Sequence, residues 1–285
     1  MNRYFKGYYF KCAGADRSFA LIPALHADEN KSKASLQLIT DDKVYVIPYP
    51  DINFSNREFK IKIGNNYFSE KGMYLDVDYE KCQIHGKLKF GRFQNIQYDI
   101  MGPFQYIPYM QCKHSVISMS HSVTGKVYIN DTKYFFQNGI GYIEGDRGRS
   151  FPKEYIWTQC HWSNISLMLA VADIPLLGFS MEGIIGVVMI GNQEYRIATY
   201  LGAKLLSISE DKVVIKQGRY ILFAQLIEEN HQRLNAPVRG RMIRTIHESI
   251  SCKAYYKFTY NDRILFEFTS AHASFGHEIN CSNQN

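Results

Sequence analysis

Two carboxylates stand two residues apart in the most distinctive segment of the sequence, GYIEGDRGRSFP at residues 141–152. In an extended segment such residues point to the same side, so Glu144 and Asp146 would lie roughly 7 Å apart. When two carboxyls that close are partly removed from water, the pKa of one of them rises. A carboxyl that keeps its proton near neutral pH can donate it to a substrate. We therefore predict that Asp146 or Glu144 is a catalytic proton donor.

The same segment also allows a structural role for the pair. Arg147 and Arg149 follow directly, and in a surface turn they would neutralise both carboxylates. Only an enzyme needs an acid that stays protonated near pH 7 and points into a cavity. Glu278 is a weaker candidate for this acid, because it lies near a polar C-terminal tail.

A row of amphipathic side chains follows the carboxylates. In an extended strand, one face is shared by Tyr155, Trp157, Gln159 and His161. Such a row suits a cavity for a flat, mostly apolar ligand with one or two polar atoms. It equally suits a barrel interior whose polar tips bond to the backbone. We predict that the four side chains converge on one cavity and that they, together with His114, bind a hydrophobic ligand.

Metal and cofactor sites find little support in the sequence. His114 and His121 are an odd number of residues apart, so they face opposite sides of a straight strand, and the pair His272 and His277 fails the same test. The six cysteines form no CxxC pair, which favours reduced thiols in the interior. No glycine-rich phosphate loop follows a strand pattern. We expect no metal and no cofactor.

The elements that must position these residues are short antiparallel strands. Residues 59–63 alternate apolar and charged side chains, break at Gly64-Asn65-Asn66 and resume at Tyr67, which predicts a hairpin. The pattern recurs at 127–129, which ends in the turn pair Asn130-Asp131, and at 187–200 and 206–215, each with a turn pair in the middle. It recurs again at 255–268, which folds back at Asn261-Asp262. Helical periodicity is nearly absent. The sequence therefore predicts an all-β fold of antiparallel sheets with at most short helices.

Length and composition agree with this fold and limit the partners. The 285 residues are 46% hydrophobic and include 21 tyrosines and 18 phenylalanines, which favour strands. We expect two domains, residues 1–135 and 136–285.

The 33 basic and 27 acidic residues are scattered, so nucleic acid is not an expected partner, whereas an anionic membrane surface would attract the chain mildly. The N-terminus lacks the apolar core of a secretory signal and no apolar run is long enough to cross a bilayer, which predicts a cytoplasmic protein.

The central segment resembles the signature of the tocopherol cyclase-like family, Y-x-E-K-x-W-G-x-x-F-P-x-x-W-x-W-x-Q. The matching residues are Tyr142, Glu144, Gly148, Phe151, Pro152, Trp157 and Gln159, and Asp146 corresponds to an acidic residue common in bacterial members. Residues 7–11, 234–237 and 244–249 resemble further motifs of the family, and matches extend from residue 7 to residue 278. Tyr8 of the first motif completes the expected ligand-binding residues.

The resemblance implies two lipocalin-like β-barrel halves and an enzyme that closes a chromanol ring on a prenylated hydroquinone without a redox cofactor. In that reaction an acid protonates the prenyl double bond, and the phenol oxygen attacks the tertiary cation. The chain departs from the family pattern at Lys6, Tyr8, Gly145 and Arg147. Because a cationic Arg147 inside the cavity would oppose a carbocation, two hypotheses stay open. One is a cyclase-like enzyme acting on an isoprenoid or quinone-type lipid, and the other is a non-catalytic carrier of a hydrophobic ligand.

Overall fold

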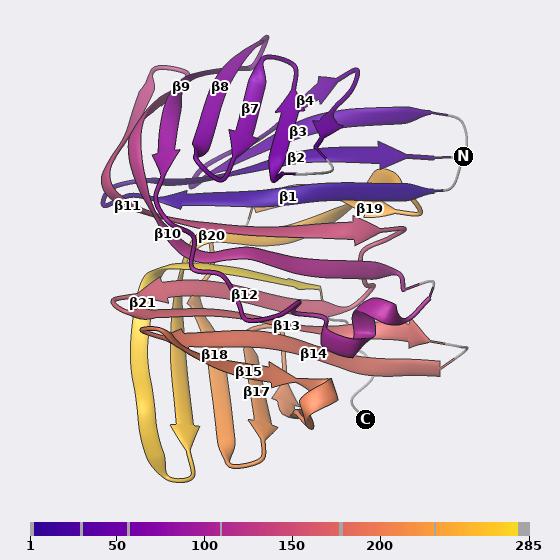
Figure 1. The fold of residues 1–285 in the computed structure, drawn as a ribbon, viewed down its shortest axis with the longest axis vertical. Helices are drawn as coiled ribbons and strands as arrows, with labels where there is room; N and C mark the ends of the chain where they lie inside the picture. The colour runs from indigo at the N-terminus through magenta and orange to yellow at the C-terminus, as the bar shows by residue number, and fades with distance from the viewer. Residues whose placement is uncertain are drawn as a thin grey trace. The chain divides into compact units, whose positions relative to one another are not determined.

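Antiparallel strands make up nearly all of the protein (Figure 1). The computed structural model describes residues 3–28, 31–55, 58–108, 110–176, 179–230 and 232–278. Within these ranges the helices are two short 3-10 turns, η1 (Gly102–Tyr106) and η2 (Thr199–Leu201). Neither has the length or the apolar character to cross a bilayer. The all-β prediction is confirmed.

The first sheet has 11 strands in the order β4-β3-β2-β1-β11-β10-β9-β8-β7-β6-β5. Its strands are β1 (Tyr4–Ala13), β2 (Ser18–Ala27), β3 (Ser32–Thr40), β4 (Val44–Tyr49), β5 (Asn53–Phe54), β6 (Lys60–Ile63), β7 (Asn66–Ser69), β8 (Gly72–Tyr79), β9 (Cys82–Phe90), β10 (Cys112–Ile129) and β11 (Thr132–Gly148).

The second sheet has 10 strands, nine of them in the order β15-β14-β13-β12-β21-β20-β18-β17-β16, while β19 pairs with β20. Its strands are β12 (Tyr155–Trp162), β13 (Ile165–Leu176), β14 (Phe179–Ile190), β15 (Gln193–Ala198), β16 (Lys204–Ile208), β17 (Lys212–Gln217), β18 (Tyr220–Glu228), β19 (Gln232–Val238), β20 (Arg241–Tyr260) and β21 (Arg263–Glu278).

The two sheets repeat one order of pairing. In each, the first strand pairs with the second and also with the last, so β1 lies between β2 and β11, and β12 lies between β13 and β21. The prediction of two similar β halves is confirmed at this level. The lipocalin-like barrel form of each half stays a prediction.

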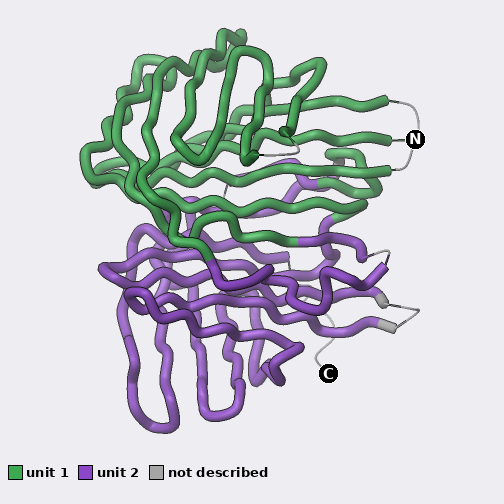
Figure 2. Tube along the Cα trace, viewed as in Figure 1, with its two compact units in different colours: residues 1–95, 114–150, 237–243 green, residues 96–113, 151–236, 244–285 purple. Residues whose placement is uncertain are grey.

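The chain also divides into two compact units (Figure 2). Unit 1 contains Met1–Asn95, His114–Ser150 and Pro237–Ile243, and unit 2 contains Ile96–Lys113, Phe151–Ala236 and Arg244–Asn285. The expected domain boundary at residues 135 and 136 falls inside β11 and stays a prediction.

Each unit has its own apolar core, built from alternate residues of its strands. In unit 1, Phe10 and Cys12 of β1 and Ile143 of β11 belong to the core, and in unit 2 Ile156 and Cys160 of β12 do. The other face of β1 and β11 is therefore free to carry polar groups. The described cysteines are free thiols and four of them are buried, as expected, whereas Cys281 lies outside the described residues.

The turns follow the sequence closely, with one exception. Asn130 and Asn261 adopt left-handed backbone angles, with φ of 49° and 51°, at the two predicted Asn-Asp turns, because asparagine tolerates this conformation. The strand expected to continue to residue 200 instead ends at Ala198. There the Thr199 hydroxyl accepts the backbone N–H of Ile184 at 2.8 Å and takes the place of a backbone acceptor.

Candidate acid–base site

The polar side chains of β11, Tyr142, Glu144 and Asp146, lie on the face of the strand that points away from the core. In the register with β1, Glu144 is opposite Tyr9 and Tyr142 is opposite Lys11, while the intervening Ile143 points into the core. Tyr142 and Glu144 are 1% and 6% exposed. The same-face spacing predicted for Glu144 and Asp146 therefore holds in a regular strand, not in a surface turn.

His114 of β10 lies between the two carboxylates. Its Nδ1 is 3.0 Å from Asp146 Oδ1, and its Nε2 is 3.3 Å from Glu144 Oε2. Its side chain is 11% exposed. The sequence placed all three residues among the candidates but did not predict that the histidine joins the carboxylates. We call these residues the His114 cluster.

The proton on His114 is held by charge. Burial by itself lowers the pKa of an imidazole, but the carboxylates of Asp146 and Glu144 outweigh burial and raise the pKa of His114 well above its usual value. His114 therefore favours the imidazolium form more than an ordinary histidine does, and its ring is mostly shielded from water. The sequence hypothesis of a carboxyl proton donor, Asp146 or Glu144, stays a prediction, and the structure adds His114 as a further candidate.

Neighbouring groups fix the geometry of the cluster. The Tyr142 hydroxyl donates a hydrogen bond to Glu144 Oε2 at 2.5 Å. Burial, and then the charge of Glu144, raises the pKa of Tyr142 well above 10, so the phenol stays a donor. The Ser115 hydroxyl donates to the Gly145 carbonyl at 2.9 Å, which ties β10 to β11 next to His114.

His121 of the same strand has the opposite character. Its ring centroid lies 4.6 Å from that of Phe90 and 4.7 Å from that of Phe93, and Ser118 Oγ is 2.9 Å from its Nδ1. Burial lowers the pKa of His121 to about 3, so the ring is neutral. Within the described part of the chain no carboxylate contacts His121, so of the two histidines His114 is the candidate that holds a proton.

The His114 cluster also has the residue types of a metal site. One ligand atom from each of His114, Glu144 and Asp146 lies within 4.8 Å of the others. Sequence reasoning compared histidines only with one another and did not consider this set. However, the two carboxylates contact different nitrogens of one ring, and one ion cannot replace both contacts. The observed arrangement fits a shared proton better than a metal.

Small residues adjoin Asp146 on the same face. Asp146 is opposite Gly7 on β1, and Gly7 is opposite Ala24 on β2. A Cβ on Gly7 would lie 3.2 Å from Ala24 Cβ and 3.7 Å from Ile22 Cγ2, so the two strands pack closely beside Asp146.

The four departures from the family pattern occupy the other face of the β1–β11 pair. Tyr8 is directly opposite Gly145, and Lys6 is directly opposite Arg147. A Cβ on Gly145 would lie 2.5 Å from Tyr8 Cδ1, so the glycine makes room for the tyrosine ring. Since Arg147 alternates with Asp146 along the strand, it points away from the His114 cluster. The expected conflict between Arg147 and a carbocation at this site does not arise.

Tyr8 itself packs on the core side. Its ring centroid lies 5.8 Å from that of Phe54 and 5.2 Å from that of Phe59. The structure therefore separates Tyr8 from the His114 cluster, and its ligand-binding role stays a prediction.

The amphipathic row of β12 is largely buried. Tyr155, Trp157 and Gln159 are 8%, 7% and 2% exposed, whereas His161 is partly exposed. The Tyr155 hydroxyl donates to Glu248 Oε1 at 3.3 Å, and burial, followed by the charge of Glu248, raises the pKa of Tyr155 well above 10. The alternation is as predicted, and convergence on a ligand cavity stays a prediction.

Glu278 has a different set of partners. Its carboxylate lies 3.4 Å from Arg244 Nη2 and 3.3 Å from His247 Nδ1. Arg244 also donates to the carbonyls of Pro152 and Lys153 at 2.5 Å each. These contacts hold the segment before β12 and give Glu278 a structural role.

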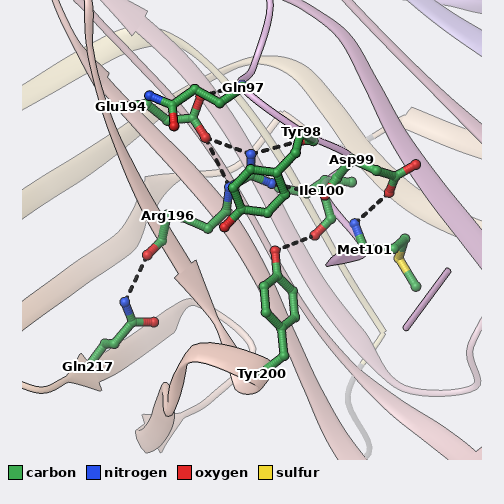
Figure 3. A network of polar contacts seen from close by, with 9 residues as sticks. All are labelled: Gln97, Tyr98, Asp99, Ile100, Met101, Glu194, Arg196, Tyr200 and Gln217. Atoms are coloured by element: carbon green, nitrogen blue, oxygen red, sulfur yellow. Dashed lines mark hydrogen bonds and ion pairs between the residues drawn. The ribbon is translucent and has the colours of Figure 1, made fainter. Parts of the chain in front are cut away.

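A second buried ion pair, also missed from the sequence, lies in unit 2 (Figure 3). Arg196 Nη2 is 2.6 Å from Glu194 Oε1, and the two side chains are 6% and 3% exposed. Arg196 also donates to the carbonyls of Tyr98 and Asp99 at 2.9 and 3.3 Å, and its guanidinium carbon is 4.0 Å from the Tyr98 ring centroid. Gln97 N donates to Glu194 Oε2 at 2.7 Å. Because backbone groups bind both charges, this network fastens residues 97–99 to β15.

Fold and site together define an all-β protein of two like-ordered antiparallel sheets that holds a buried carboxylate–histidine–carboxylate cluster. The family model described as tocopherol cyclase-like matches residues 65–174, a range that includes the whole His114 cluster. The resemblance predicted from the central motif is confirmed. No curated protein matches the chain in sequence.

Solved structures share the fold at low sequence identity. CghA, solved with Sch210972, is 7% identical with a TM-score of 0.64 over 96% of this chain and 88% of that chain. Kievitone hydratase from Nectria haematococca is 8% identical with a TM-score of 0.54 over 97% and 89%. A putative AttH from Nitrosomonas europaea is 8% identical with a TM-score of 0.52 over 97% and 93%. At these identities the likeness concerns the fold alone.

Proposed function

We propose that the protein is a cyclase-like enzyme that uses the His114 cluster to close a ring on a prenylated hydroquinone or a related isoprenoid lipid. The observation that carries the proposal is the position of His114 between Glu144 and Asp146, at 3.3 and 3.0 Å. The family match over residues 65–174 supports the reaction class.

The reaction needs no co-reactant. The His114 cluster donates its proton to the prenyl double bond, and a tertiary carbocation forms. The phenol oxygen bonds to this carbon, and the phenol proton returns to the cluster, so substrate and product are isomers. The carboxylates of Glu144 and Asp146 stabilise the cation electrostatically while the proton is away.

Binding of the apolar part of the substrate is assigned to buried aromatic groups. Trp157 and Tyr155 are the predicted binding groups for the apolar part, and Gln159 and His161 for the polar head, and these roles stay predictions. Aromatic faces near the cation contribute about 0.5 to 2 kcal/mol each. Binding that holds the prenyl chain of the substrate folded against the hydroquinone ring supplies much of the remaining reduction of the activation barrier.

The test is turnover in deuterium oxide. Purified protein is incubated with a prenylated hydroquinone dispersed in detergent, and the product is analysed by mass spectrometry. Proton addition to the double bond predicts a ring-closed product with one deuterium on carbon. Asp146→Asn and His114→Gln should each lower turnover by about 10² or more, with little change in ligand affinity.

His85→Gln is the matched control. His85 Nδ1 lies 3.0 Å from Asp76 Oδ1, the same distance as in the His114 cluster, but this side chain is 52% exposed. The control should keep full turnover. If Asp146→Asn, Glu144→Gln and His114→Gln all turn over at the wild-type rate, the acid lies elsewhere.

The second candidate function is a non-catalytic carrier, which the deeply buried Trp157 and Gln159 also fit. Tight ligand binding by the wild type with no ring closure would establish the carrier and contradict the enzyme. A cytoplasmic location stays a prediction for either function.

A further inference from the structure

The outer face of the first sheet carries a straight row of lysines and tyrosines. Across neighbouring strands Lys62 is opposite Tyr67, Tyr67 is opposite Tyr74, Tyr74 is opposite Lys87, and Lys87 is opposite Lys126. These five side chains, the Lys–Tyr row, belong to β6, β7, β8, β9 and β10. With strands about 4.8 Å apart, the row is roughly 19 Å long. Figure 1 shows β7, β8 and β9 side by side.

The lysines of the Lys–Tyr row form no ion pair with the residues that the structure describes. Lys62, Lys87 and Lys126 are exposed, and in the described ranges none of the three makes an ion pair. Lys87 and Lys126 are directly opposite each other, and like charges in this position destabilise a sheet. Nearby carboxylates are engaged elsewhere, since Asp76 contacts His85 and Glu58 contacts Lys60. The row is therefore suited to an anionic partner.

The row is also aromatic. Tyr67 and Tyr74 are 38% and 47% exposed, and Tyr128 of β10 and Phe135 of the adjacent β11 are 41% and 59% exposed. Tyrosine rings prefer the boundary between lipid headgroups and water. An exposed phenylalanine beside them favours an apolar phase over a purely aqueous partner.

We propose that the Lys–Tyr row docks the protein onto an anionic lipid surface. The lysines contact phosphate and carboxylate groups of the headgroups, and the tyrosine rings lie at the boundary of the acyl region. The inference rests on the proposed function in one respect: a substrate dissolved in a membrane gives the enzyme a reason to bind there. Single-stranded nucleic acid, which also binds lysines and aromatic rings, is the other outcome of the test.

The experiment is flotation of the full chain with vesicles of phosphatidylcholine and phosphatidylserine at 7:3, compared with phosphatidylcholine alone. The wild type should float with the anionic vesicles and detach at high salt. Each lysine near such a surface contributes about a factor of five, so Lys87→Glu with Lys126→Glu should weaken binding about 25-fold or more. Tyr67→Ser with Tyr74→Ser should weaken it as well. Lys87→Gln with Lys126→Gln is a milder version for the case that charge reversal impairs folding.

The matched control changes a second pair of opposed lysines. Lys204 and Lys216 are exposed and directly opposite each other on β16 and β17, but the next residue across the sheet is Ile221. Lys204→Glu with Lys216→Glu alters net charge equally and should keep vesicle binding. The proposal would be overturned if both double lysine variants lost vesicle binding equally, or if the wild type bound both kinds of vesicle equally. Tighter binding of a single-stranded oligonucleotide to the row would overturn it as well.

Failure of this inference is distinguishable from failure of the proposed function. Vesicle binding requires no turnover, so it is measured even if the protein closes no ring. Conversely, Lys87→Glu with Lys126→Glu should leave turnover of detergent-dispersed substrate unchanged, because neither lysine belongs to the His114 cluster.

Discussion

His114 determines what the two carboxylates of β11 can do. The imidazole lies between Glu144 and Asp146 and contacts both of them. The cluster then carries one positive and two negative charges in a mostly dehydrated place. Such a centre releases a proton to a substrate and regains it with little movement of the protein, which suits an isomerisation.

The raised pKa of His114 makes stability depend on pH in a defined direction. A histidine that binds its proton more tightly when folded stabilises the protein below its unfolded-state pKa of about 6.5, and this contribution is lost as pH rises through the higher folded-state pKa. Urea midpoints of the wild type should therefore fall relative to those of His114→Gln as pH increases above about 6.5. His85→Gln should follow the wild type. A difference that grows with pH would contradict the assignment.

The residues of the His114 cluster could be predicted from the sequence, but their assembly into one site could not. The spacing of Glu144 and Asp146 indicated a shared face, and the Asn130-Asp131 turn was recognised. His114 lies 16 residues before Asn130 and Asp146 lies 15 residues after Asp131, so a continuous hairpin brings them nearly level. The sequence interpretation tested histidines only against each other within one strand, and contacts between strands decide this site.

The β1–β11 strand pair shows how a departure from a family pattern can be compensated. Tyr8 occupies the space that the missing side chain of Gly145 leaves. Gly145→Ala should therefore destabilise the protein by about 1 to 3 kcal/mol, because its Cβ would meet the Tyr8 ring. In urea unfolding, the added substitution Tyr8→Ala should remove most of the effect of Gly145→Ala. Purely additive effects would mean that the two positions are independent.

The Arg196–Glu194 ion pair of β15 holds residues 97–99, and its contribution to stability can be tested. Arg196→Met leaves Glu194 buried without its cation and frees the carbonyls of Tyr98 and Asp99. Breaking a buried pair in this way costs about 3 to 5 kcal/mol. Arg196→Met with Glu194→Leu should recover part of this loss in thermal unfolding. A single variant as stable as the wild type would show that the network contributes little.

Individual strands were more predictable than their ends and partners. Alternation and Asn-Asp turns identified the hairpins because those signals are local. The end of β15 at Ala198 depended on the Thr199 hydroxyl, and the Arg196 network depended on a segment almost a hundred residues earlier in the chain. Neither contact leaves a periodic trace in the sequence.

At the scale of the molecule, two sheets of like order carry different chemistry. In the first sheet β10 and β11 hold the His114 cluster, whereas in the second sheet β12, β20 and β21 hold the Tyr155 and Glu278 contacts. The fold is shared with CghA and kievitone hydratase at 7% and 8% identity, so the fold leaves the site free to vary. The function therefore has to be tested at the cluster.

The most direct test is the protonation state of His114. Nuclear magnetic resonance of protein labelled with 15N in its histidine rings follows each imidazole as pH changes, and His114→Gln assigns the signal. The account predicts that His114 loses its proton at a distinctly higher pH than an ordinary histidine, while His121 stays neutral down to pH 5. A His114 that loses its proton at or below pH 6.5 would contradict the proton-holding cluster and the enzyme built on it.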